Sequence, residues 1–143
     1  MAGLMDGSLS TLAPIFAVAL ATQHPRYAFF AGLASAIGAG VSMAFSEGLS
    51  DTGEVTGRGS PYQRGSIVGA GTFVGGVLHT LPFLIPDLHV ALILAIVMVA
   101  FELLTLSWIR WYFFETGFVR SFVSITLGGL VIVGISAAIG SAG

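Results

Sequence analysis

The chain of 143 residues is 55% hydrophobic and only 8% charged, with a mean hydropathy of +0.96. This composition excludes a water-soluble domain, in which about a quarter of the residues carry charge, and the apolar content excludes a disordered chain. The net charge of −2 offers no basic patch, so nucleic acid is not an expected partner. The absence of cysteine excludes disulfides and thiolate metal sites. We therefore predict an integral membrane protein surrounded by lipid.

Five apolar stretches are each long enough to cross the membrane, whose hydrocarbon layer of roughly 30 Å takes about 20 helical residues. They are residues 3–21, 27–46, 65–85, 89–111 and 119–140. None shows the alternating pattern of a membrane β-strand, so helices are favoured. Short polar turns separate them, except between the second and third, where glycines and Pro61 indicate a longer loop. We expect an all-α fold with five transmembrane helices in a single membrane domain over residues 1–143.

The distribution of arginines predicts the orientation of the bundle. Arg58 and Arg64 lie between the second and third spans, and Arg110 and Arg120 flank the turn between the last two. These two connections share a side of the membrane, and only Arg26 lies on the other side. The positive-inside rule places the arginine-rich side in the cytoplasm. The N-terminus is therefore expected to be cytoplasmic and the C-terminus outside.

Small residues recur at helical spacing in three of the spans. In lipid, helices associate through close contact of such residues. The stripes are Gly32, Ala36 and Gly40 in the second span, Gly65 with Gly69 and Gly71 with Gly75 in the third, and Gly134 with Ala138 in the fifth. We expect these stripes to serve helix packing, either within one chain or between two copies.

Three acids fall inside the spans or at their ends: Asp6, Glu47 and Glu102. An ionisable group inside the membrane costs roughly 2.5–3.5 kcal/mol on insertion scales, so each acid is a functional candidate. No arginine is expected at a comparable depth to pair with them. Glu102 lies eight residues before Arg110, roughly 12 Å inside the hydrocarbon, and is expected to be protonated and hydrogen-bonded. Its role is either a proton relay or a structural hydrogen bond to a neighbouring helix.

Met43, Glu47, Asp51 and Glu54 are spaced so that all four share one helical face, provided that the second helix continues beyond the membrane. Carboxylates suit hard divalent cations, while a methionine sulfur favours softer metals. A path with both ligand types suits Fe²⁺ or Mn²⁺ that is bound and then released. The alternative interpretation is that the two later acids are solvated loop residues and that Met43 fills the core.

Only one of the three histidines, His79, lies well inside a predicted span. His24 and His89 lie near the outer surface. A metal site of His79, Asp87 and His89 on the outer side is one interpretation. Positions in a turn and at the membrane interface explain these residues equally well.

Two sequence motifs indicate a family. The segment from Gly3 to Thr11 reads G-x-x-D-G-x-x-S-T, and the segment from Ser42 to Glu47 reads S-M-x-x-x-E. They resemble the first helix and the end of the second helix of vacuolar iron transporters. Over essentially all of its length, the chain is most similar to the membrane domain of bacterial membrane-bound ferritins of the erythrin–vacuolar iron transporter type, here without the ferritin-like domain.

The resemblance implies a homodimer in the bacterial inner membrane, whose pathway follows the subunit interface and is lined by the first helix. It implies that Asp6 is the mid-membrane carboxylate and that Met43 and Glu47 are metal ligands of the second helix. The implied activity is export of Fe²⁺ or Mn²⁺ from the cytoplasm in exchange for protons. In this interpretation Asp51 and Glu54 bind metal at the cytoplasmic mouth. The metal is the transported ion, and no permanently bound cofactor is expected.

A competing hypothesis is an auxiliary transmembrane subunit that does not transport and packs against a larger membrane protein complex. The connection between the second and third spans is a short Gly/Ser loop, whereas plant and parasite members of the family carry an acidic metal-binding domain there. An enzyme is not expected, because the sequence shows no buried Ser/His arrangement, HExxH motif or catalytic pair of acids. Dependence of metal movement on Asp6 and Met43 separates the two hypotheses.

Overall fold

The computed structural model of the chain is all-helical and describes residues 2–54, 56–114 and 117–142. Its elements are α1 (Ala2–Thr22), α2 (Pro25–Gly48), α3 (Pro61–Thr80), the 3₁₀ turn η1 (Leu81–Leu84), α4 (Leu88–Phe114) and α5 (Phe118–Ser141). Within the described residues, four helical segments are long and apolar enough to cross a membrane: α1, α2, α3 together with η1, and α4. The prediction of an all-α chain with five long helices is confirmed, and four of these fit the spans of a multi-pass membrane protein.

Prolines determine several helix boundaries. Pro25 and Pro61 occupy the first turns of α2 and α3, where the fixed φ and the missing N–H of proline are tolerated. The third span therefore begins at Pro61 rather than at residue 65, and its α-helical part ends at Thr80 rather than at residue 85. Pro82 explains the early end, because it cannot donate a hydrogen bond to the preceding turn and the chain tightens into η1.

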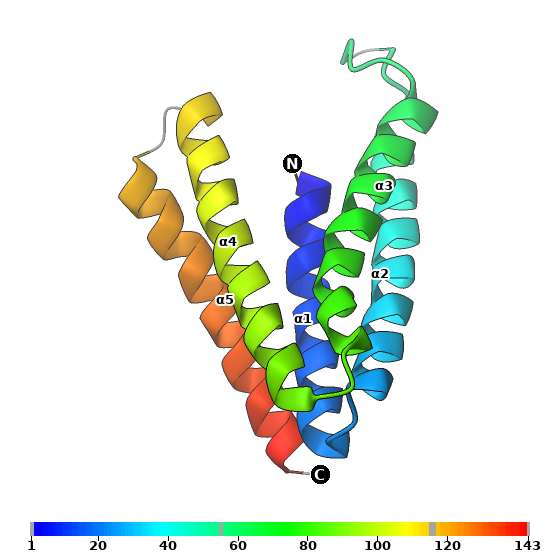
Figure 1. Cartoon of the computed structure of the whole chain (residues 1–143). Helices are drawn as coiled ribbons and strands as arrows, with labels where there is room; N and C mark the ends of the chain where they lie inside the picture. The colour runs from blue at the N-terminus through cyan, green and yellow to red at the C-terminus, as the bar shows by residue number, and fades with distance from the viewer. Residues whose placement is uncertain (1, 55, 115–116, 143) are drawn as a thin grey trace.

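Consecutive helices run in opposite directions, and α1 lies between the α2–α3 pair and the α4–α5 hairpin (Figure 1). α1 packs closely on α2, α3 and α5, whereas α4 packs on α5 and η1 and contacts α3 only sparsely. The hairpin therefore stays against the bundle near the C-terminus and diverges from it toward the opposite end (Figure 1). The start of α1 and the loop between α2 and α3 lie on the diverging side.

The main hydrophobic core explains where the hairpin is attached. Its buried members come from α1, α2, η1 and the first half of α4: Leu12, Ile15, Phe16, Ala19, Ala28, Phe83, Ala91 and Ala95. All of the α1 members lie in its second half, so the core joins this part of α1 to the start of α4. Beyond this core, toward the start of α1, α4 has fewer buried apolar partners.

Small residues bring α2 and α3 into close contact, as the stripes predicted. Gly32, Ala36 and Gly40 are buried in α2, and Gly65 and Gly69 are buried in α3. Gly75 of α3 is also buried, but it faces Leu4 of α1. A Cβ atom built on Gly40 would lie 3.1 Å from the carbonyl oxygen of Gly69. This spacing leaves no room for a larger side chain, and it is the close approach that holds helices together in lipid.

The predicted stripe of the fifth span does not pack within the chain. A Cβ atom built on Gly134 would meet no other part of the described chain within 4 Å, and Ala138 is exposed. α5 contacts α1 through Gly140 instead, where an added Cβ would lie 2.8 Å from the carbonyl oxygen of Ala17. The face of α5 that carries Gly134 is left uncovered by the rest of the described chain.

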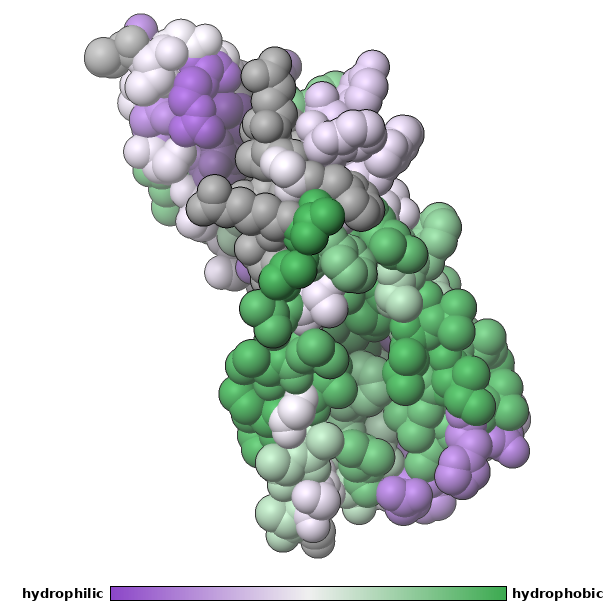
Figure 2. Space-filling view, turned by 90° about the vertical axis from the view of Figure 1, so that its left-hand side faces the viewer, coloured by the Kyte–Doolittle hydropathy of each residue, from purple (hydrophilic) through white to green (hydrophobic). Residues whose placement is uncertain are grey.

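The surface agrees with a membrane environment. Large apolar side chains are exposed along the helices, with Phe101 71% and Leu130 62% exposed. Figure 2 shows a broad hydrophobic zone on the face turned to the viewer, with hydrophilic residues gathered toward its two ends. A water-soluble protein rarely exposes so large an apolar surface, and this zone fits the four helices that are long and apolar enough to cross a membrane.

Candidate functional site

A buried polar cluster joins three helices inside the bundle. It consists of Ser8 of α1, His79 of α3 and Glu102 of α4. Ser8 is 3% and His79 2% exposed, and the side chain of Glu102 is 19% exposed. Nε2 of His79 lies 2.8 Å from Oε2 of Glu102, and the hydroxyl of Ser8 donates to Oε1 of the same carboxyl. Ionisable side chains are rare and costly inside apolar membrane helices, so the cluster is the first candidate site.

The second ring nitrogen of His79 limits the protonation states of the cluster. Nδ1 lies 2.9 Å from the carbonyl oxygen of Gly75, and a carbonyl can only accept, so Nδ1 carries a hydrogen. Nε2 is then either bare beside a protonated Glu102 or protonated beside an ionised Glu102. The contact between Nε2 and Oε2 is short, yet it is not aligned as a regular hydrogen bond in the described structure.

The cluster borders an apolar groove between α4 and the pair of α1 and α3. The groove has a volume of about 520 Å³ and lies against His79 and Glu102. Most of its lining is apolar, as at Leu4 of α1, Leu78 of α3 and Phe101 of α4. It occupies the region where α4 diverges from the bundle. His79 and Glu102 therefore border a largely apolar space.

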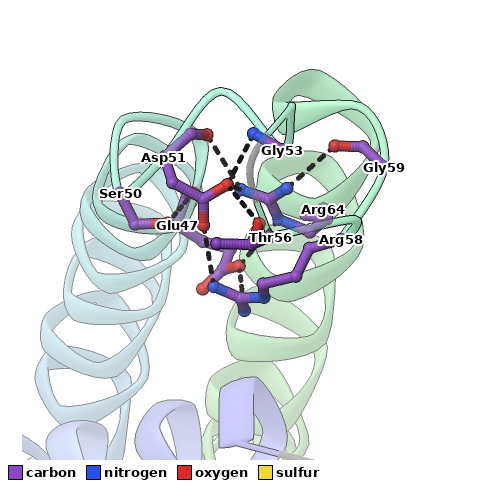
Figure 3. Close-up of polar contacts among 8 residues, drawn as sticks. All are labelled: Glu47, Ser50, Asp51, Gly53, Thr56, Arg58, Gly59 and Arg64. Carbon is purple, nitrogen blue, oxygen red and sulfur yellow. Dashed lines mark hydrogen bonds and ion pairs between the residues drawn. The ribbon is translucent and has the colours of Figure 1, made fainter.

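A second polar cluster lies where α2 ends, and Figure 3 shows its members pointing toward one another. Nη2 of Arg58 lies 2.8 Å and Nε of Arg64 lies 3.0 Å from Oε1 of Glu47. The same two arginines reach the carboxylate of Asp51, at 3.1 Å and 3.5 Å. Nη1 of Arg64 also donates to the carbonyl oxygen of Gly59 at 2.9 Å. Two acids and two arginines thus form a network of four ion pairs.

This network corrects two expectations from the sequence. Glu47 does have arginine partners, because the loop folds back and brings Arg58 and Arg64 to the end of α2. α2 ends at Gly48, so Asp51 and Glu54 lie in the loop and not on a continued helical face with Met43. The helix ends in a turn at Leu49, where the amide of Ser50 donates to the carbonyl oxygen of Glu47 at 3.3 Å.

Asp51 organises the loop. Its Oδ1 accepts from the amide of Gly53 at 2.6 Å and from the hydroxyl of Thr56 at 3.0 Å. Partial desolvation acts to raise the pKa of Asp51, but the bonds from Thr56 and Gly53 lower it, together with the charges of Arg64 and Arg58. The pKa of Asp51 consequently lies below its usual value. Asp51 is ionised at neutral pH and fixes the path of the loop.

The remaining candidate metal ligands are not assembled. Asp6 and Met43 are each half-buried, on α1 and α2, and Glu54 is exposed in the loop. Asp6 has no ion pair or side-chain hydrogen bond within the described residues. Over the same part of the chain, no group of three or more acidic or histidine side chains is placed to hold a metal ion.

The outer-side metal site suggested by three polar residues is not formed. His79 faces Glu102, and Oδ1 of Asp87 accepts from the amide of Val90 at 3.0 Å, which caps the start of α4. His89 is exposed. The interpretation of Asp87 as a residue of a turn and helix start is therefore the correct one.

The sequence interpretation found Glu102 but missed its partners. The expected hydrogen bond to a neighbouring helix is confirmed by Ser8 of α1, while nothing in the sequence linked Glu102 to His79. One available signal was that both are ionisable residues inside apolar spans, where such groups pair with one another.

Comparison with models of protein families, with curated proteins and with solved structures found no match for this chain.

Proposed function

We propose that the protein transports a divalent cation, Fe²⁺ or Mn²⁺, out of the cytoplasm in exchange for protons. The observation that carries the proposal is the pair of ionisable side chains, His79 and Glu102, held inside helices that are otherwise apolar. Such groups are costly in a membrane and mark ion and proton pathways. A pair that served packing alone is replaceable by apolar side chains at lower cost.

The proposed carrier is a homodimer in the bacterial inner membrane, with the N-terminus and the loop between α2 and α3 in the cytoplasm. In this arrangement Asp6 and Met43 of two copies bind the ion inside the membrane. The half-buried position of Asp6, without a partner in the described part of one chain, supports this role. An unpaired carboxylate in hydrocarbon needs a cation, a proton or water. Two copies offer twice the ligands that one chain brings together.

Glu47 and Asp51 receive the ion at the cytoplasmic mouth, with Glu54 as an exposed first contact. Their ion pairs with Arg58 and Arg64 impose a condition on this step. A divalent cation has to displace at least one guanidinium before it binds both carboxylates. We therefore assign these residues to a transient encounter with the metal and not to a tight storage site.

The alternative function is that of an auxiliary subunit packed against a larger membrane complex. The apolar groove beside α4 and the uncovered face of α5 favour it, since both are surfaces on which another helix packs. Under this hypothesis the acids in the bundle serve its architecture, and metal movement is absent.

Metal flux into sealed proteoliposomes tests the proposal directly. The purified chain is expected to move Mn²⁺ down a concentration gradient, with loss of at least tenfold in Asp6→Asn and in Met43→Leu. Asp87→Asn is the matched control, because Asp87 caps α4 and lies outside the proposed path. Absence of Mn²⁺ and Fe²⁺ flux in the wild type refutes transport. Co-purification with a larger complex at fixed stoichiometry then supports the auxiliary role.

A further inference from the structure

The geometry around Glu102 places a limit on the charge of the cluster. Nδ1 of His79 keeps the hydrogen that it donates to the carbonyl oxygen of Gly75, so Nε2 is the ring nitrogen of His79 that can gain or lose a hydrogen. Nε2 and Oε2 of Glu102 are 2.8 Å apart. Two atoms that both present lone pairs repel at this distance. One of the two therefore carries a hydrogen in the stable form, although the side chains are not aligned as a regular hydrogen bond.

A single hydrogen between these atoms also makes the cluster neutral. It gives either a neutral imidazole beside a carboxylic acid or an imidazolium beside a carboxylate, and the sum of charges is zero in both. A second proton gives a net charge of +1 and its loss gives −1. Apolar helices and the groove surround the cluster, and a net charge there is costly.

We propose that His79 and Glu102 form a proton-binding site within the membrane that holds one exchangeable proton between Nε2 and Oε2. Ser8 is the positioning residue of this site. Its one hydrogen has two acceptors, Oε1 of Glu102 and the carbonyl oxygen of Leu4 at 2.8 Å. The hydroxyl therefore turns toward the carboxyl when Glu102 is ionised and back toward Leu4 when a proton neutralises it.

No other charged group among the described side chains reaches the site. On α1, the acid closest to Ser8 in the sequence is Asp6. On α3, the charged residue is Arg64, which forms ion pairs with Glu47 and Asp51. On α4, His89 lies near the start of the helix and is exposed. The side chains of Arg110 on α4 and Arg120 on α5 lie outside the described residues. The titration of the site is accordingly assigned to His79 and Glu102 as one unit.

The role of this site in exchange rests on the proposed function, whereas its existence does not. When the proton leaves, one cluster changes from neutral to a net charge of −1, and the two clusters of the proposed homodimer together reach −2. This equals the charge of one arriving divalent cation. When the cation leaves, a proton returns to Nε2 or Oε2 in each copy, so that two protons exchange for one divalent cation and move in the opposite direction.

Nuclear magnetic resonance of the imidazole nitrogens tests the existence of the site. A chain with His24→Gln and His89→Gln keeps His79 as its only histidine, and it is studied in lipid nanodiscs with labelled histidine and glutamate. We expect Nδ1 to stay protonated throughout, and the Nε2 and Glu102 carboxyl signals to change together in a single step. Signals that change at separate pH values, or an Nε2 signal that is constant from pH 5 to pH 9, overturn the proposal.

Variants in the same background separate a shared proton from simple packing. In Glu102→Gln, Nε2 is expected to remain bare across this pH range, because a buried imidazolium would have no carboxylate to compensate its charge. Ser8→Ala is expected to retain the single step at a shifted pH, as a positioning residue requires. Glu54→Gln is the matched control, since it removes a carboxyl from the exposed loop, and its spectrum should equal that of the parent. An unchanged step in Glu102→Gln overturns the assignment.

Measurement of proton counterflow tests the role of His79 and Glu102 in exchange. In proteoliposomes with a pH-sensitive dye, wild-type Mn²⁺ movement should be accompanied by protons, and Glu102→Gln should reduce the counterflow at least tenfold. Equal counterflow in wild type and variant refutes the role of the pair. If the wild type moves no Mn²⁺ while the histidine titrates as expected, the proton site stands and the proposed transport function fails.

Discussion

Oε2 of Glu102 on α4 lies 2.8 Å from Nε2 of His79 on α3, and both side chains are largely buried. The other oxygen of the carboxyl accepts from Ser8 on α1. One carboxyl thus connects three helices at the level where α4 has few apolar contacts with the bundle. It is the polar link between the α4–α5 hairpin and the rest of the described structure on the diverging side.

A double-mutant cycle measures this link. Glu102→Leu and His79→Leu each leave a buried polar partner unsatisfied, whereas the double variant removes both. We expect a coupling free energy of about 0.5–3 kcal/mol, the range for residues in direct contact. Steric-trap unfolding in bicelles provides the free energies. Ser8→Ala should cost less than either single variant, about 0.6 kcal/mol as for other hydrogen bonds between membrane helices. Purely additive effects of the two leucine variants contradict the pairing.

The contact of α1 with α3 gives a prediction about glycine. A Cβ atom on Gly7 would collide with the backbone carbonyl of Thr72, so Gly7→Ala has to push the helices apart. The expected loss of stability is about 1–3 kcal/mol, as for other overpacked sites. Gly134→Ala is the matched control, because nothing in the described structure lies within 4 Å of its Cβ position. The thermal midpoint in detergent reports both, and equal midpoints for the two variants contradict the close packing.

The helices were predictable from sequence because their causes are local. Apolar length sets the spans, although the prediction began two of them at residues 27 and 65, whereas α2 and α3 begin at Pro25 and Pro61. The small-residue stripes of α2 and α3 were predictable for the same reason, since a helix places every fourth residue on one face.

The polar clusters were not predictable from local pattern. Ser8 and Glu102 are separated by 94 positions, and their contact depends on how α4 docks against α1. The pairing of Glu47 with Arg58 and Arg64 depends on a loop that turns back, for which Gly53, Gly57 and Gly59 adopt positive φ angles. Glycines in the loop indicated a turn, but a spacing in sequence does not specify which charges a turn brings together.

The two arginines of the loop should contribute unequally to stability. The side chain of Arg64 is 13% exposed and that of Arg58 is 50% exposed, and Arg64 also holds two backbone carbonyls. Arg58→Gln is expected to cost about 0–1 kcal/mol, as exposed ion pairs do. Arg64→Gln should cost about 1.5–3 kcal/mol, typical of lost hydrogen bonds to charged groups. Rates of proteolysis in the loop measure the difference. Faster cleavage of the Arg58 variant contradicts the assignment.

The lowered pKa of Asp51 predicts how the stability of the loop responds to acid. Because its pKa in the folded protein lies below the usual value, the unfolded loop binds the proton more tightly. Its stabilising contribution is complete above the ordinary value of about 3.9 and is lost as the pH falls through the lower, folded value. Loop proteolysis by an acid-active protease should accelerate in the wild type below about pH 4. In Asp51→Asn, cleavage of the loop by a protease that is active at neutral pH should already be fast, and the acid dependence should be absent.

Competition between metal and arginine is the last consequence of the network. If Glu47 and Asp51 bind the incoming ion, Arg58 is the partner that it displaces, since the Arg58 side chain is the more exposed of the two. Removal of its charge should strengthen binding. We expect Arg58→Gln to lower the Mn²⁺ dissociation constant at this end by about tenfold, which corresponds to about 1.4 kcal/mol. The double variant Arg58→Gln with Glu47→Gln should lose that gain. Calorimetry on the protein in nanodiscs measures both, and a dissociation constant unaffected by Arg58 excludes these carboxylates from the metal path.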